Sequence, residues 1–260
     1  MIETMVLETT EPVTAFTDES MIRRIHAEGI VLLGGGRALL MQIAHPAVAA
    51  GVAEHSSFRT DRLQRLLRTL RPTLAIAFGR PDQVWAAAGT VNATHARVVG
   101  HGYRALDPAL LAWVLATLID TTLLMHDRFV RPLSEDEAEG YYEDMKTAGR
   151  LLLIPDGTLP ATLRGFHSYV DEMVATLAVS GTARELAAAI FRPSGVAAPL
   201  LVVQRELSAA LLPERLRSGF GLGWGSRREA SVRAAERLSC RLWPLLPARM
   251  RRPPSFLMPG

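Results

Sequence analysis

Apolar residues recur through most of the chain at spacings of three and four, which is the pattern of helices that bury one face. Alternation with a period of two is missing, and so are hairpin turns of the Asn-Gly type. The pattern predicts an all-α protein with roughly eight to ten helices in a single multi-helix domain. The expected helices cover residues 21–33, 37–43, 47–52, 62–70, 83–99, 110–129, 135–149, 182–191, 200–211 and 227–242, and another opens at residues 160–162.

Local signals predict where several of these helices begin and end. Asp107 followed by Pro108 offers an N-cap with proline at the first helical position, and residues 134–137 form a capping box. The residue before a proline avoids the α region, so a helix should end before Pro46. Pro72 should interrupt the helix that starts at residue 62 for a related reason, because its ring clashes with the preceding turn.

The longest apolar stretch covers residues 29–58 and contains three consecutive glycines at 34–36. A nucleotide-binding turn is one interpretation of these glycines, but Leu39 stands where the G-x-G-x-x-G pattern requires glycine. Close packing of helices is the interpretation we favour. Residues 29–53 are long enough to span a bilayer. Their centre carries Arg37 and other polar groups, so we expect a buried helical hairpin and no transmembrane segment.

Composition narrows the protein class further. The first twelve residues are acidic and lack an apolar core, so we expect no signal peptide and a cytoplasmic location. Cys240 is the only cysteine, which excludes disulfides within the chain and cysteine-based zinc sites. We expect a loose arm over residues 1–18, one domain over residues 19–247, and a Pro/Arg-rich tail over residues 248–260. The sequence leaves open whether the chain forms a homo-oligomer.

The basic charge does not indicate a nucleic-acid partner. Lys146 is the only lysine among 29 basic residues, which suggests the codon bias of a GC-rich genome. Ten arginines and three glutamates from residue 213 onwards give that region a balance of +7, so the rest of the chain carries −4 of the net +3. We interpret the basic region as a solvated helix face rather than a surface for RNA or acidic lipid.

Several catalytic motifs are absent. The sequence has no H-E-x-x-H zinc motif, no G-x-S-x-G nucleophile elbow and no P-loop. None of the seven histidines has glutamate three residues before it, so the E-x-x-H motif of di-iron bundles is missing too.

His95, in VNATHARVVG, is the first candidate site residue. It lies beside valines on a helix face that should point inward, where a neutral imidazole could bind iron while a neighbour holds its other nitrogen. A histidine that is merely packed in the core is the alternative.

Two further groups of polar residues are candidates. Arg65, Arg68 and Thr69 share one helical face and suit carboxylates such as haem propionates, although a solvated basic face would look the same. The isolated polar groups in apolar helices are either structural partners or groups that orient an iron-binding histidine. These are Arg37, His45 and Asp120, and His126, Asp127 and Arg128 cluster near the end of the helix that contains Asp120.

Several segments together resemble the MpaB-type oxygenases, the family that includes the latex-clearing rubber oxygenases. The resemblance covers about residues 19–247 and is carried by LLGGGRALLMQIAHPAVAAGVAEHSSF, RLLRTLRPTLAIAFG, VNATHARVVGHGYRALDP, WVLATLIDTTLLMHDRFVRPLS and LLLIPDGTLPAT. It implies a helical fold with a globin-like core and a non-covalent haem b. It also implies that His95 is the proximal iron ligand and that Arg65, Arg68 and Thr69 lie on the distal side.

The chain departs from the rubber oxygenases at three positions. Arg68 replaces a lysine that ligates iron in some of them, and a guanidinium stays protonated, so water or O₂ should occupy the distal position. Asn92 and Val99 replace a histidine one turn before the ligand and an arginine one turn after it. The resemblance therefore implies different tuning of His95 and a substrate other than rubber.

The sequence thus predicts a haem b-dependent oxygenase that uses O₂ on a hydrophobic small molecule, with an isoprenoid-like compound as one candidate. The helix over residues 110–129 is expected to line the substrate pocket, and Arg37, His45, Asn92 and Asp120 are expected around the cofactor. Two alternatives remain open: a haem protein with a peroxidase-like or sensing role, and a haem-free helical module that binds a lipid or terpenoid.

Overall fold

The computed structural model describes residues 16–55, 62–192 and 198–260, with only the backbone of residues 62–68. These residues form an all-α fold with one short hairpin, and thirteen α-helices lie within them. The globin-like character of the core stays a prediction. The helices are α1 (Met21–His26), α2 (Gly35–Ala44), α3 (Pro46–His55), α4 (Arg62–Phe78), α5 (Pro81–Ala96), α6 (Pro108–Phe129), α7 (Glu135–Leu151), α8 (Leu163–Thr176), α9 (Gly181–Ile190), α10 (Ala198–Leu211), α11 (Glu214–Gly219), α12 (Ser226–Leu242) and α13 (Ala248–Arg251).

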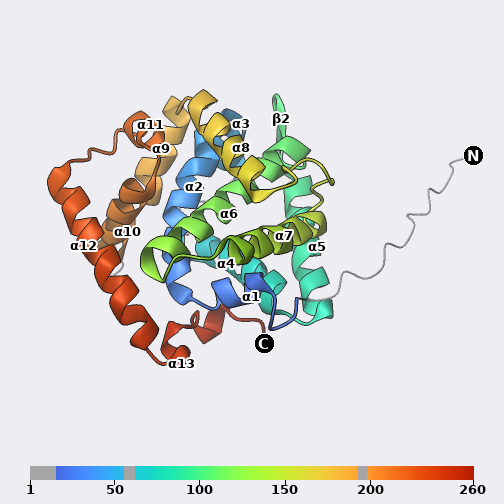
Figure 1. Ribbon diagram of the computed structural model, residues 1–260. Helices are drawn as coiled ribbons and strands as arrows, with labels where there is room; N and C mark the ends of the chain where they lie inside the picture. The colour runs from blue at the N-terminus through green and yellow to red at the C-terminus, as the bar shows by residue number, and fades with distance from the viewer. Residues whose placement is uncertain (1–15, 56–61, 193–197) are drawn as a thin grey trace, which may run out of the picture.

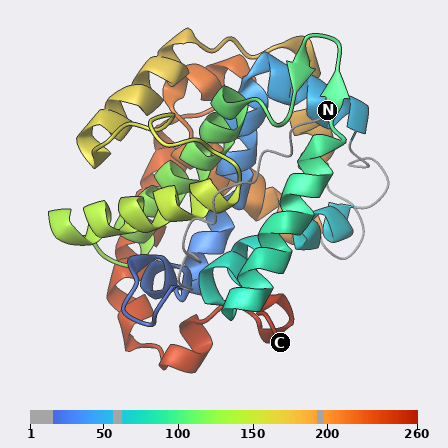
Figure 2. The same cartoon turned by 90° about the vertical axis from the view of Figure 1, so that its right-hand side faces the viewer.

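Helix α6 is the central element (Figure 1), and α2, α7, α8 and α12 all pack against it. Half of its residues are buried, and Trp113 is fully enclosed, with its Nε1 donating to the carbonyl oxygen of Met41 at 3.2 Å. A largely apolar helix reaches this position because it can bury side chains all round rather than along one stripe. Helices α4 and α5 pack against each other on another side of the molecule (Figure 2).

The local signals for helix ends are confirmed. The Asp107 carboxylate caps α6 by accepting from the backbone N–H of Ala109 at 2.9 Å, and Ser134 and Glu137 form the capping box of α7. Helix α2 ends at Ala44, and its C-cap His45 is extended with ψ 124° before the proline that opens α3.

Four expectations about the elements were wrong. The first is the number of helices, because thirteen lie within the described residues and we expected eight to ten. Pro72 lies inside α4 and does not end it, because residues beyond it, including Leu74 and Ala77, are buried and hold the helix by packing. The helix expected over residues 21–33 splits into α1 and the 3₁₀ helix η1 (Gly29–Gly34). Helix α5 ends at Ala96, and β1 (Val99–Gly100) then pairs antiparallel with β2 (Tyr103–Arg104), where we expected no strand.

The glycines of the apolar stretch allow close contacts between helices. A β-carbon on Gly34 would lie 2.6 Å from Thr121 Cγ2 of α6, and one on Gly36 would collide with Ser208 of α10. Only glycine permits such approach. The close-packing interpretation is therefore confirmed, and the arrangement gives no support to a nucleotide-binding turn.

The C-terminal segment returns to the start of the chain. After η3 (Trp243–Leu245) and α13, the Arg251 guanidinium pairs with the Glu28 carboxylate, which also accepts from Trp243 Nε1 at 2.6 Å. Leu257, in η4 (Ser255–Leu257), is buried, so part of the segment expected as a tail packs against the domain. Phe16 is buried as well, while residues 1–15 of the expected arm lie outside the described residues. The domain boundaries at residues 18 and 247 stay predictions.

Helix α6 is long and apolar enough to cross a membrane, and 56% of its most apolar window is buried inside the protein. Two bent helix pairs pass the same test of length and composition: η1–α2 with α3, bent by 107°, and α8 with α9, bent by 109°. The expectation of no transmembrane segment therefore stays a prediction.

His26 makes folding stability depend on pH. Its Nε2 lies 3.0 Å from the Tyr141 hydroxyl, and complete burial lowers its pKa from 6.5 to about 4. The unfolded chain therefore binds more protons than the folded one between these values, so stability is lost as pH falls from 6.5 towards 4. The loss attributable to His26 should reach about 3 kcal/mol.

In His26→Gln the free energy of unfolding should change less steeply with pH between 6.5 and 4 than in the parent protein. The difference in slope should correspond to the uptake of about one proton on unfolding. Urea unfolding followed by circular dichroism at several pH values measures this slope. His101→Gln, at an exposed position, is the matched control and should keep the slope of the parent protein. An unchanged slope in His26→Gln would contradict the assignment.

Candidate functional site

His95 lies in the last turn of α5 and is half-buried. Burial lowers the pKa of its imidazole, so the ring is neutral at pH 7. Its Nδ1 is buried and has no hydrogen-bond partner among the described residues. A neutral imidazole with an unsatisfied buried nitrogen is chemically able to bind a metal ion or to hydrogen-bond a bound group.

Asn92 precedes His95 by one helical turn, so both side chains lie on one face of α5. The Asn92 Nδ2 donates to the carbonyl oxygen of Leu151, at the end of α7, at 2.9 Å. This bond fixes the amide and ties α5 to α7. The Asn92 Oδ1 remains buried without a partner among the described residues, so α5 carries an unused acceptor one turn before the unused nitrogen of His95.

The predicted distal residues lie in α4, the helix that packs against α5. Arg65 and Arg68 fall in the part of α4 where the backbone alone is described, so their roles stay predictions. Thr69 is exposed, and its carbonyl oxygen accepts from Thr73 Oγ1 at 2.9 Å within the helix.

His45 is the C-cap of α2 and has a buried Nδ1 without a partner among the described residues. Burial lowers its pKa, and the nearby Asp107 carboxylate opposes that shift. The ring therefore resembles that of His95 in being neutral and incompletely hydrogen-bonded. Its predicted role near a cofactor stays a prediction.

The buried Arg37 pairs with Asp120, whose side chain is 21% exposed. Arg37 Nη2 lies 2.6 Å from Asp120 Oδ2, Nη1 donates to Thr121 Oγ1 at 2.6 Å, and Nε donates to the carbonyl oxygen of Leu211 at 2.8 Å. These bonds join α2, α6 and α10. Since every nitrogen of the guanidinium has a partner within the protein, the geometry favours the structural interpretation of this pair.

No group of three or more histidine, cysteine, aspartate or glutamate side chains within the described ranges is placed to hold a metal ion. A candidate metal centre in this part of the chain would therefore rest on at most two of these side chains. Haem fits that requirement, because the macrocycle supplies the other ligands of the iron.

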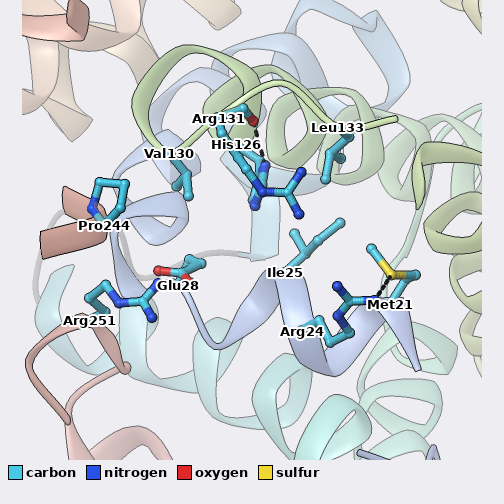
Figure 3. A pocket seen from close by; sticks show the side chains of 10 residues that line it. All are labelled: Met21, Arg24, Ile25, Glu28, His126, Val130, Arg131, Leu133, Pro244 and Arg251. Atoms are coloured by element: carbon cyan, nitrogen blue, oxygen red, sulfur yellow. Dashed lines mark hydrogen bonds and ion pairs between the residues drawn. The ribbon is translucent and has the colours of Figure 1, made fainter. Parts of the chain in front are cut away.

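A cavity of about 170 Å³ lies away from these residues, between α1, the end of α6 and the C-terminal segment (Figure 3). We name it the α1–α6 cavity. Its polar wall consists of Arg24, Glu28, His126, Arg131 and Arg251, and its apolar wall consists of Met21, Ile25, Val130, Leu133 and Pro244.

His126 and Arg131 meet at one side of the α1–α6 cavity (Figure 3). The Nδ1–H of His126 donates to the carbonyl oxygen of Arg131 at 2.9 Å, and burial lowers the pKa of the ring. The Arg131 guanidinium binds both oxygens of Glu137, at 2.7 and 2.8 Å, and lowers the pKa of that carboxyl to about 2. The sequence singled out His126 but gave no signal for Glu28, Arg131 or Arg251, since nothing local links segments so far apart.

Comparison with known proteins gives one family. The profile described as "ER-bound oxygenase mpaB/B'/Rubber oxygenase, catalytic domain" matches residues 22–240. Two uncharacterized proteins, Rv2237 of Mycobacterium tuberculosis and Mb2261 of Mycobacterium bovis, are each 28% identical to this chain over 156 residues. The match covers 56% of this chain and 61% of each relative. No solved structure matches the chain significantly. Because the profile spans most of its length, the chain belongs to the family of MpaB-type and rubber oxygenases.

Proposed function

We propose that the protein is a haem b-dependent oxygenase that uses O₂ to oxidise a hydrophobic small molecule. One observation supports the presence of a cofactor. Five side-chain nitrogen or oxygen atoms are buried without a partner among the described residues, and three of them belong to His45, Asn92 and His95. Buried polar groups are rarely left unsatisfied, so their concentration in residues expected around a cofactor supports a missing group there.

His95 is the residue that would hold the haem iron. Its imidazole is neutral, as an iron ligand must be, because burial lowers its pKa. The unused acceptor of Asn92, on the same face of α5, is not bonded to His95 in this structure, and it would accept a hydrogen bond from the His95 Nδ1–H once haem is bound. That hydrogen bond would orient the ring and leave Nε2 for the iron.

The neighbouring helices would complete the site. Arg65 and Arg68 of α4 would bind the haem propionates or polarise oxygen, with Thr69 next to them, because guanidinium groups suit carboxylates. His45 would line the pocket. When bound, haem would supply the oxidising chemistry, while apolar side chains of the core would hold the substrate and exclude water.

The proposal is tested by expressing the full chain with haem supply and recording its absorption spectrum. A Soret band supports the cofactor, and a colourless protein that takes up no haemin refutes it. Oxygen uptake with a panel of isoprenoids and other polyenes then separates an oxygenase from a haem protein with a peroxidase-like or sensing role. Binding of a terpenoid by protein that takes up no haem would instead support a lipid carrier.

A further inference from the structure

We propose that the α1–α6 cavity binds a small monocarboxylate, whose charged group pairs with arginine and whose short apolar chain lies on the opposite wall. The cavity does not include His95, and the proposal does not depend on the proposed oxygenase function.

Charge at the cavity supports an anionic ligand. Three arginines line it, whereas only two carboxylates neutralise them: Glu137 pairs with Arg131 and Arg24, and Glu28 pairs with Arg251. Among the described residues one positive charge is therefore left over, shared between Arg24 and Arg131, whose side chains are each about half exposed. The Arg251 Nε is also buried without a partner in the described part of the chain, so a donor is available as well. A bound carboxylate would satisfy both.

His126 adds no further positive charge to the cavity. Its ring is neutral because burial lowers its pKa. Since Nδ1–H donates to the carbonyl oxygen of Arg131, Nε2 carries the lone pair and is an acceptor. The ring points into the cavity (Figure 3), so it would accept a hydrogen bond from a ligand hydroxyl without adding charge.

The size and the apolar wall select the rest of the ligand. Ile25, Val130 and Leu133 offer no hydrogen bonds, so a phosphate or sulfate would leave oxygens unpaired against them. The cavity of about 170 Å³ corresponds to about five or six volumes of liquid water. A carboxylic acid of about four carbons fits this space and this division into a charged and an apolar side.

Isothermal titration calorimetry on the full chain, with and without added haemin, tests the proposal. Butanoate is the probe, and n-butylammonium and inorganic phosphate are the comparison ligands. We expect butanoate to bind at least about tenfold more tightly than either, and equally with and without haemin. Failure to bind butanoate at millimolar concentration, or equal binding of phosphate, would overturn the proposal. Affinity that changes with haemin would place the site at the iron instead.

Variants locate the site. Arg24→Gln and Arg251→Gln should each weaken butanoate binding by about tenfold. Arg233→Gln, which removes an equivalent charge from the exposed surface of α12, should leave the affinity unchanged. Leu133→Phe should abolish butanoate binding by filling the cavity. If circular dichroism shows that Arg251→Gln is unfolded, Leu133→Phe still tests whether butanoate binds in the cavity. Unchanged affinity in both Arg24→Gln and Leu133→Phe would refute the site.

Discussion

His95→Ala is expected to remove the Soret band and to weaken haemin binding by more than about 100-fold. The reason is that the described residues contain no group of three or more metal-binding side chains that could hold the iron in place of the lost imidazole. Haemin titration followed by absorption measures the affinity. Circular dichroism in the absence of haemin shows whether α5 remains folded.

Two matched variants sharpen this result. His101→Ala removes an exposed imidazole near the same helix and should leave the spectrum unchanged. Asn92→Ala should retain the Soret band but weaken haemin binding by about tenfold, because only the orientation of His95 is affected. A His95→Ala protein with the affinity and spectrum of the parent would rule out His95 as the ligand.

Asp120→Ala should lower the free energy of unfolding by about 3 to 5 kcal/mol. The change leaves the Arg37 guanidinium, whose side chain is only 5% exposed, with an uncompensated buried charge. Urea unfolding monitored by circular dichroism measures the loss. Arg37→Met combined with Asp120→Leu should recover part of it, because removing both charges costs less than stranding one.

The control for this prediction is an ion pair on the surface. Glu229→Ala breaks the exposed pair with Arg233 in α12 and should cost less than about 1 kcal/mol. A comparable loss in Asp120→Ala would mean that solvent or a rearranged partner compensates Arg37. The pair would then contribute little to the cohesion of α2, α6 and α10.

Much of the fold could be predicted because helix ends depend on short-range chemistry. The Asp107 cap and the capping box at Ser134 use bonds between residues two or three apart, so the sequence alone contains them. The prediction that Pro72 interrupts α4 was wrong because it took no account of long-range packing. The effect of this proline depends on how α4 packs against α5, and that packing outweighs the lost backbone bond.

The candidate site, too, could be predicted only in part from the sequence. His95 could be identified from its helix and from the family resemblance, but the unpartnered atoms of His95 and Asn92 appear only once the helices are assembled. The α1–α6 cavity could not be predicted. It brings together residues from three distant segments, and periodicity carries no information about such contacts.

The return of the C-terminal segment to Glu28 has a consequence for synthesis of the protein. Glu28 is bonded to Trp243 and Arg251, which lie 215 and 223 residues later in the sequence. At about 5 to 20 residues per second, a ribosome needs roughly 10 to 45 s to make the intervening chain. During that time the Glu28 carboxylate lacks both of these partners. The turn around Glu28 is therefore expected to gain its full protection later than α1, which packs on the earlier helices α4 and α7.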